Sequence, residues 1–167
     1  MKRLILTRHA KSSWDDPLTP DHDRPLNDRG KAGAADLGQW LASRGYIPDQ
    51  VLCSDAERTR QTWSGIAPAL PGTPLMELKP ALYHAGAEVM LAVLRHATAD
   101  CVMIIGHNPG IADFAAKLVA HAPLHPEFLR YPTGATLVAD FAVGDWAHVA
   151  FGQGSVIDFT IPREIVV

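Results

Sequence analysis

Four side chains that suit phosphate chemistry stand shortly after the ends of three apolar runs. They are Arg8, His9, Arg58 and His107. Two guanidinium groups offer paired hydrogen-bond donors that fit a tetrahedral oxyanion such as phosphate. A neutral imidazole can attack phosphorus, and a second imidazole can share the charge of the transferring oxygens. The pattern therefore predicts a phosphoryl-transfer site that needs neither a metal ion nor another cofactor.

Helical patterns separate the apolar runs. A helix is predicted over residues 28–44, because Asn27 can cap its first turn and Gly45 can end it. Ser54 and Glu57 have the spacing of a capping box, which predicts a second helix that ends before the next proline. Two more helices are predicted, one over residues 87–97 and one that begins at Pro109 with Asn108 as its cap.

Strand-like runs alternate with these helices. CVMII is the clearest buried strand, and the segments ATLVADFA, WAHVAFG and SVIDFTI are predicted strands of the last third. The alternation predicts an α/β fold, a single-domain three-layer sandwich whose mostly parallel central sheet is flanked by helices. Its 167 residues fit one domain, which we expect to span residues 1–167. Because ligands bind at the carboxyl ends of parallel strands, the four side chains should meet in one crevice.

The composition argues against several classes of protein. A formal charge of -3 gives no reason to expect binding to nucleic acid or to a membrane surface. Arg8 and His9 interrupt the first apolar run before it reaches the length of a secretory signal, and no later run could span a bilayer. Cys53 and Cys101 lack the CxxC spacing, which favours buried thiols in a reducing compartment. We therefore expect a cytoplasmic protein, with a monomer as the default.

The motifs resemble those of the histidine phosphatase superfamily, which has the phosphoglycerate mutase-like fold. That family carries Arg-His-Gly after its first strand, S-x-x-x-R after its second and Gly-His after a later buried strand. The matching segments here are RHA at 8–10, SDAER at 54–58 and GH at 106–107. The stretches LTRHAKSSWDDP, DHDRPLNDRG, SDAERTRQTW and IIGHNPG are most similar to the small SixA-type phosphohistidine phosphatase branch. Together these motifs cover most of the chain.

The resemblance implies a role for each of the four side chains. His9 would be the nucleophile and would form a transient phosphohistidine. Arg8 and Arg58 would hold the phosphoryl oxygens, and His107 would complete the pocket. To attack, His9 must be neutral, so its second ring nitrogen should donate to a backbone carbonyl or a similar acceptor. The arginine charges would favour that neutral form. The substrate would be a phosphorylated protein or a small phosphorylated molecule.

Two residues depart from the family pattern near the nucleophile. Ala10 replaces the motif glycine, which is tolerable if the backbone there does not need a positive φ. Asp15 stands six residues after His9, where mutase-like relatives have an asparagine that helps to hold the phosphate. Because a carboxylate would repel phosphate, we expect Asp15 to point elsewhere or to pair with a cation.

The third departure concerns the leaving group. Mutases and many phosphomonoesterases of the family have an acidic residue in an L-x-E context, and Pro80 stands at the nearest match here. An alkoxide needs a proton from such an acid, whereas the nitrogen of phosphohistidine can be protonated from solvent. The sequence therefore favours P–N cleavage, with Glu77, Glu88 or no residue at all as the general acid. Glu88 also fits the first turn of its predicted helix.

Other interpretations stay open. A phosphatase of a small metabolite is possible, but short connections predict an open crevice, which suits a protein-borne phosphoryl group. A non-catalytic module that binds phosphoproteins would not need both histidines. The charged segment 21–24 could touch substrate at the rim or could be a solvated loop. His121 and His125 have the i, i+4 spacing of metal ligands, but Pro123 argues against the helix that would give this spacing meaning.

Overall fold

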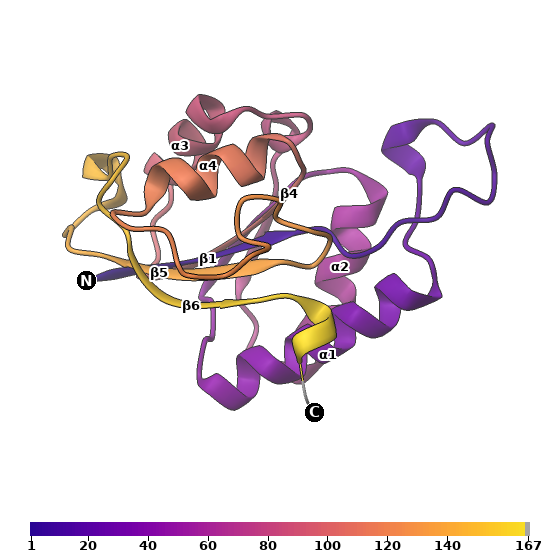
Figure 1. Ribbon diagram of the computed structural model, residues 1–167, viewed down its shortest axis with the longest axis horizontal. Helices are drawn as coiled ribbons and strands as arrows, with labels where there is room; N and C mark the ends of the chain where they lie inside the picture. Colours follow the sequence, from indigo (N-terminus) through magenta and orange to yellow (C-terminus); the bar gives the residue numbers. More distant parts are fainter. Residues whose placement is uncertain (166–167) are drawn as a thin grey trace.

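The computed structural model describes residues 1–165, and in it one sheet lies between two layers of helices (Figure 1). The strand order is β3-β2-β4-β1-β5-β6. Neighbours among β1 to β4 pair in parallel, whereas β5 pairs antiparallel with β1 and β6. The predicted α/β sandwich is thus confirmed, and residues 166 and 167 of the predicted domain lie outside the described part. The strands are β1 (Lys2–Arg8), β2 (Gln50–Cys53), β3 (Leu75–Leu78), β4 (Cys101–Gly106), β5 (Thr136–Phe141) and β6 (Ser155–Thr160).

Four α-helices cover the sheet, with α1 and α2 on one face and α3 and α4 on the other (Figure 1). Each occupies a segment for which the sequence predicts a helix. In α1, the Asn27 side chain accepts a hydrogen bond from the N–H of Gly30 at 2.8 Å, and Gly45 ends the helix with a φ of 74°. Within residues 1–165, no helix combines the length and apolar character needed to cross a membrane. The helices are α1 (Asp28–Arg44), α2 (Glu57–Ile66), α3 (Ala87–Arg95) and α4 (Gly110–Leu118).

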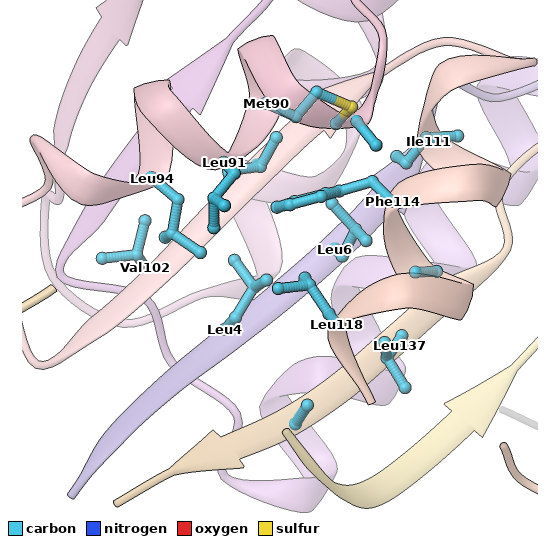
Figure 2. Packing of buried hydrophobic residues seen from close by; sticks show 14 of the residues in the cluster. Leu4, Leu6, Met90, Leu91, Leu94, Val102, Ile111, Phe114, Leu118 and Leu137 are labelled. Atoms are coloured by element: carbon cyan, nitrogen blue, oxygen red, sulfur yellow. The ribbon is translucent and has the colours of Figure 1, made fainter. Parts of the chain in front are cut away.

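Strand β1 is buried on both faces, because its successive side chains alternate between two separate cores. Leu4 and Leu6 pack beneath α3 and α4, where Phe114 fills the space between the helices and the sheet (Figure 2). Ile5 points to the opposite face and joins the core under α1, which includes Leu41. Because β1 is packed on both faces, the residues that follow its carboxyl end are held in a fixed position.

The predicted starts of two helices are wrong. Helix α2 begins at Glu57 without a side-chain cap, because the hydroxyl of Ser54 instead accepts from the N–H of Ala56 at 3.3 Å and bonds to a histidine at 2.8 Å. Helix α4 begins at Gly110 after Pro109. This start is one residue later than predicted, although the side-chain oxygen of Asn108 still accepts from the N–H of Ala112 at 3.3 Å, as a cap would. The side-chain N–H groups of Asn108 donate to two carbonyls of the loop before β5. At Ser54, a contact distant in sequence overrides the local signal.

Two segments differ from their predicted structure. WAHVAFG contains a short 3-10 helix at Trp146–His148 instead of a strand. The side chain of Asp145 caps that turn, and the indole of buried Trp146 donates to the Ala99 carbonyl at 2.7 Å. Strand β3 was not predicted, because it follows a proline-rich connection and lies at the sheet edge with both of its leucines exposed. Its pairing with β2 is what makes it a strand.

Candidate active site

The ends of β1 and β4 deliver two histidines side by side. Arg8 pairs in register with Gly106, so that the next residue of each strand, His9 and His107, emerges at the same edge of the sheet. The N–H of His9 donates to the carbonyl of Gly106 at 3.0 Å, which ties the two ends together. The centroids of the imidazole rings lie 5.3 Å apart. This is the edge at which the sequence predicts a crevice.

All four side chains singled out in the sequence line one open cleft with a volume of about 670 Å³. Arg58 reaches it from the first turn of α2, which starts after β2. Arg58 and both histidines are almost completely buried, although each faces the cleft. The structure therefore brings together residues that are separated by up to a hundred positions, as the strand-end pattern predicts.

His9 is held in one tautomer. Its Nδ1 lies 2.7 Å from the carbonyl of Ala10, and because that oxygen can only accept, Nδ1 carries the proton and Nε2 carries the free lone pair. Burial lowers the pKa of His9 to about 3, and the charges of Arg8 and Arg58 act in the same direction. Burial therefore contributes more to the neutral form than the arginine charges proposed from the sequence. At neutral pH this imidazole is uncharged and has an unprotonated nitrogen available for attack.

His107 is oriented by the hydroxyl of Ser54, which lies 2.8 Å from its Nε2. Burial, followed by the neighbouring His9, lowers the pKa of His107 to about 3. Its Nδ1 is buried and has no hydrogen-bond partner among the described residues. The same is true of the Nε atoms of Arg8 and Arg58. A buried polar group without a partner costs about 1–3 kcal/mol, a cost that a bound oxyanion touching such groups would offset.

Arg8 is positioned from the other side of the cleft by the loop before β5. Its Nη1 donates to the carbonyl of Tyr131 at 3.2 Å, and the side chain of Asn108 donates to the same carbonyl at 3.1 Å. Tyr131 is fully buried and has a φ of 50°, a left-handed conformation that is uncommon for a bulky residue. Its hydroxyl donates to the carbonyl of Leu6 and accepts from the N–H of Leu137.

Asp21 is one of several cleft residues that the sequence analysis did not single out individually. Its carbonyl and carboxylate accept from Arg58 at 2.7 and 3.2 Å, and the carboxylate also accepts from Arg24 at 3.1 Å. The hydrogen bond from Tyr83, followed by the charge of Arg58, holds the pKa of the Asp21 carboxyl well below its usual range. The signal in the sequence was the charged segment 21–24, two of whose residues, Asp21 and Arg24, line the cleft.

Ala10 and Asp15 are the two residues near His9 that depart from the family pattern. Ala10 is not among the non-glycine residues with positive φ, which in the described part of the chain are His84 and Tyr131. Asp15 is exposed but is part of the cleft lining, and among the described residues no cation pairs with its carboxylate, so neither arrangement expected for it is observed. The backbone therefore accommodates Ala10, whereas Asp15 places an exposed carboxylate at the rim of the cleft.

The carboxylates considered as general acids lie away from the cleft lining. Glu77 is engaged on β3, where it accepts from Gln50 at 2.8 Å and pairs with Lys79 at 3.0 Å. Glu88 is exposed in the first turn of α3. His125, considered as a metal ligand, bonds to Glu164 at 2.7 Å. Among residues 1–165, no group of three or more histidines, cysteines or carboxylates is placed to hold a metal ion.

Comparison with known proteins agrees with this geometry. The family model of the histidine phosphatase superfamily (branch 1) matches residues 4–83. An uncharacterized chloroplastic protein of Arabidopsis thaliana is 38% identical over 130 residues, which are 70% of this chain and 59% of the length of that relative.

Two solved structures extend the likeness to nearly the whole chain. A proposed phosphohistidine phosphatase SixA from Agrobacterium tumefaciens is 30% identical with a TM-score of 0.78, covering 96% of this chain and 98% of its own. A similarly described SixA protein from Nakamurella multipartitia is also 30% identical, with a TM-score of 0.80 and 96% of each chain covered. With its fold, its motifs and these relatives in agreement, the chain belongs to the histidine phosphatase superfamily.

Proposed function

We propose that this protein hydrolyses phosphohistidine on a protein substrate through a covalent phosphohistidine on His9, without a metal ion. The observation that carries the proposal is the state of His9, a buried neutral imidazole with its Nδ1 proton bound to the Ala10 carbonyl. Two arginines line the cleft beside its free nitrogen. Membership of the histidine phosphatase superfamily and the description of two relatives as SixA proteins support the same assignment.

The first step would transfer the phosphoryl group to the protein. The Nε2 lone pair of His9 attacks phosphorus, the P–N bond of the substrate breaks, and the leaving imidazole takes a proton from solvent. Arg8 and Arg58 neutralise the phosphoryl oxygens, and His107 borders the same space. The phosphorylated ring of His9 then carries a positive charge, which the Ala10 carbonyl stabilises through the retained Nδ1–H. Attack by water on phosphorus breaks the Nε2–P bond, releases inorganic phosphate and restores the neutral ring.

The surroundings of the cleft favour P–N over P–O cleavage. Pro80 supplies no acid, and Glu77 and Glu88 do not line the cleft. Asp21 does line it, but its low pKa makes it a poor proton donor, and Asp15 lies exposed at the rim. A nitrogen leaving group that solvent can protonate has no need of a dedicated acid. The proposed substrate is therefore phosphohistidine, and a phosphate ester of a small metabolite is the alternative to be tested.

The domain and its location complete the proposal. We propose that residues 1–167 form one histidine phosphatase domain that acts in the cytoplasm. Cys53 and Cys101 are free thiols. Burial raises the pKa of both thiols to about 12, which makes them unreactive. Two unreactive free thiols are compatible with a reducing compartment.

The test is a parallel labelling experiment. The protein is mixed briefly with a phosphohistidine peptide, phosphoramidate or an alkyl phosphate, quenched with alkali and analysed by mass spectrometry. We expect a phosphoryl group on His9 and much faster hydrolysis of the two P–N substrates. His9→Ala should abolish hydrolysis, and His121→Ala, at an exposed histidine, should not. Equal kcat/KM for the alkyl phosphate would contradict the proposed substrate, and turnover by His9→Ala would contradict the mechanism.

A further inference from the structure

A second pocket adjoins the phosphoryl cleft. It has a volume of about 190 Å³ and shares Lys11 and Thr133 with the cleft lining. Beyond Lys11, the charged side chains that line it are Arg29 and Arg163, and no carboxylate is part of its lining. The three cations come from distant parts of the sequence, so that the fold, rather than a local basic run, creates the cluster.

Close backbone packing gives this pocket fixed walls. A Cβ atom at Gly30 would lie 2.0 Å from the carbonyl oxygen of Lys11, so only glycine lets the first turn of α1 approach this segment. A Cβ at Gly33 would meet Pro162 at 3.7 Å. Ile161, next to that proline, is 1% exposed. The pocket is therefore bounded by packed structure, and Arg29 and Arg163 project from two of its walls.

The charge of the pocket is unbalanced. In the part of the chain that the structure describes, the side chains of Lys11, Arg29 and Arg163 make no hydrogen bond or ion pair, unlike that of Arg24, which pairs with Asp21 at 3.1 Å. The chain as a whole carries a formal charge of -3, so three cations that line one pocket run against its average. Their mutual repulsion would be relieved by an anionic group bound between them.

We propose that this pocket is a subsite for a carboxylate side chain of the substrate protein, located a few residues from its phosphohistidine. The proposal rests on the proposed function, because it assigns the second contact of the same substrate. With the phosphoryl group at His9, the chain that follows it could cross Lys11 and place an acidic side chain between Arg29 and Arg163. A planar carboxylate suits the forked donors of two arginines, which could bind it from either side.

The test compares the affinities of two peptides that contain a non-hydrolysable phosphohistidine analogue. One peptide carries glutamate at the flanking positions, and the other carries glutamine. Isothermal titration is made with the wild type, with Arg29→Gln/Arg163→Gln and with Lys31→Gln. Lys31 is an exposed cation of α1 outside the pocket lining, so its variant controls for the loss of a positive charge near the pocket, with one charge removed where the double variant removes two. Lys11 is left unchanged because it also lines the phosphoryl cleft.

We expect the wild type to bind the glutamate peptide about tenfold more tightly, as two exposed ion pairs allow. The double variant should bind both peptides equally, and Lys31→Gln should keep the preference. Equal affinities in the wild type, a preference that survives the double substitution, or no binding of either peptide would overturn the proposal. Hydrolysis of phosphoramidate is measured separately. Its failure would contradict the proposed function, whereas the ratio of peptide affinities addresses the subsite alone.

Discussion

The floor and the rim of the cleft are built on different principles. On the floor, His9 and His107 are 5% and 4% exposed and follow the ends of paired strands. The rim is the segment 11–26, which extends away from the helices at the right of Figure 1 and leaves Trp14 and Leu18 75% and 89% exposed. The floor is positioned by the sheet, whereas the rim is positioned by side-chain contacts, both within the segment and with Arg58 and Tyr83. We therefore expect the floor to carry out the reaction and the rim to select the substrate.

The rim owes its shape to Arg24. This side chain is buried although it lies in a loop, and it donates to the carboxylate of Asp21 and to the hydroxyl of Ser12 at 2.9 Å. Its guanidinium also lies 3.6 Å from the ring centroid of Trp14. Arg24 thus links Ser12 and Trp14, near the start of the segment, to Asp21, which contacts Arg58.

The largest effect is expected on the floor. Arg58→Ala removes a buried donor group for the phosphoryl oxygens, and loss of one such group costs roughly 100-fold to 1,000-fold in kcat. Phosphoramidate hydrolysis measures the loss. Arg60→Ala is the matched control, since Arg60 lies two residues later in α2 with a side chain 52% exposed. A decrease of less than tenfold for Arg58→Ala would show that the floor does not carry the chemistry.

The burial of the floor histidines should also appear in stability against pH. The folded pKa of His9 is about 3, below the usual 6.5 of the unfolded chain. Between these values the unfolded state binds more protons, so stability is complete above pH 6.5 and is lost as the pH falls. By pH 5 the loss from one such histidine is about 2 kcal/mol.

His9→Gln should reduce the decline in unfolding free energy between pH 7 and pH 5 by that amount. The measurement is urea unfolding at the two pH values. His121→Gln, at an exposed position, provides the control and should follow the wild type. An identical decline in His9→Gln and the wild type would mean that His9 is not buried as the structure has it.

The smallest effect is expected on the rim. Asp21→Asn removes the negative charge that occupies Arg58, so inorganic phosphate should inhibit up to about fivefold more tightly, the range for a partly exposed ion pair. Asp16→Asn, in the same segment but outside the cleft lining, should leave the inhibition constant unchanged. Weaker inhibition of Asp21→Asn would show that Asp21 belongs with the floor as a group that supports phosphate binding.

The same contrast explains what the sequence could predict. The positions of Arg8 and His9 could be predicted because both residues stand at the end of an apolar strand, and the hydrophobic pattern indicates how strand ends are fixed by pairing. The position of Asp21 could not be predicted, because it depends on Arg24 and on a hydrogen bond from Tyr83, more than sixty residues away. The capping-box prediction at Ser54 failed for a related reason, since the hydroxyl faces a histidine that arrives from another strand.

Tyr131 gives the floor a further property. Its hydroxyl joins the carbonyl of Leu6 on β1 to the N–H of Leu137 on β5, and its carbonyl receives Arg8. Tyr131 therefore connects β1, β5 and Arg8, one of the two arginines proposed to hold the phosphoryl group. The amide hydrogens of Leu137 and His9 should exchange with solvent as slowly as those of the central strands. Arg8 would then leave its position only in the rare openings that separate β1 from β5. Local unfolding of the rim would leave Arg8 in place.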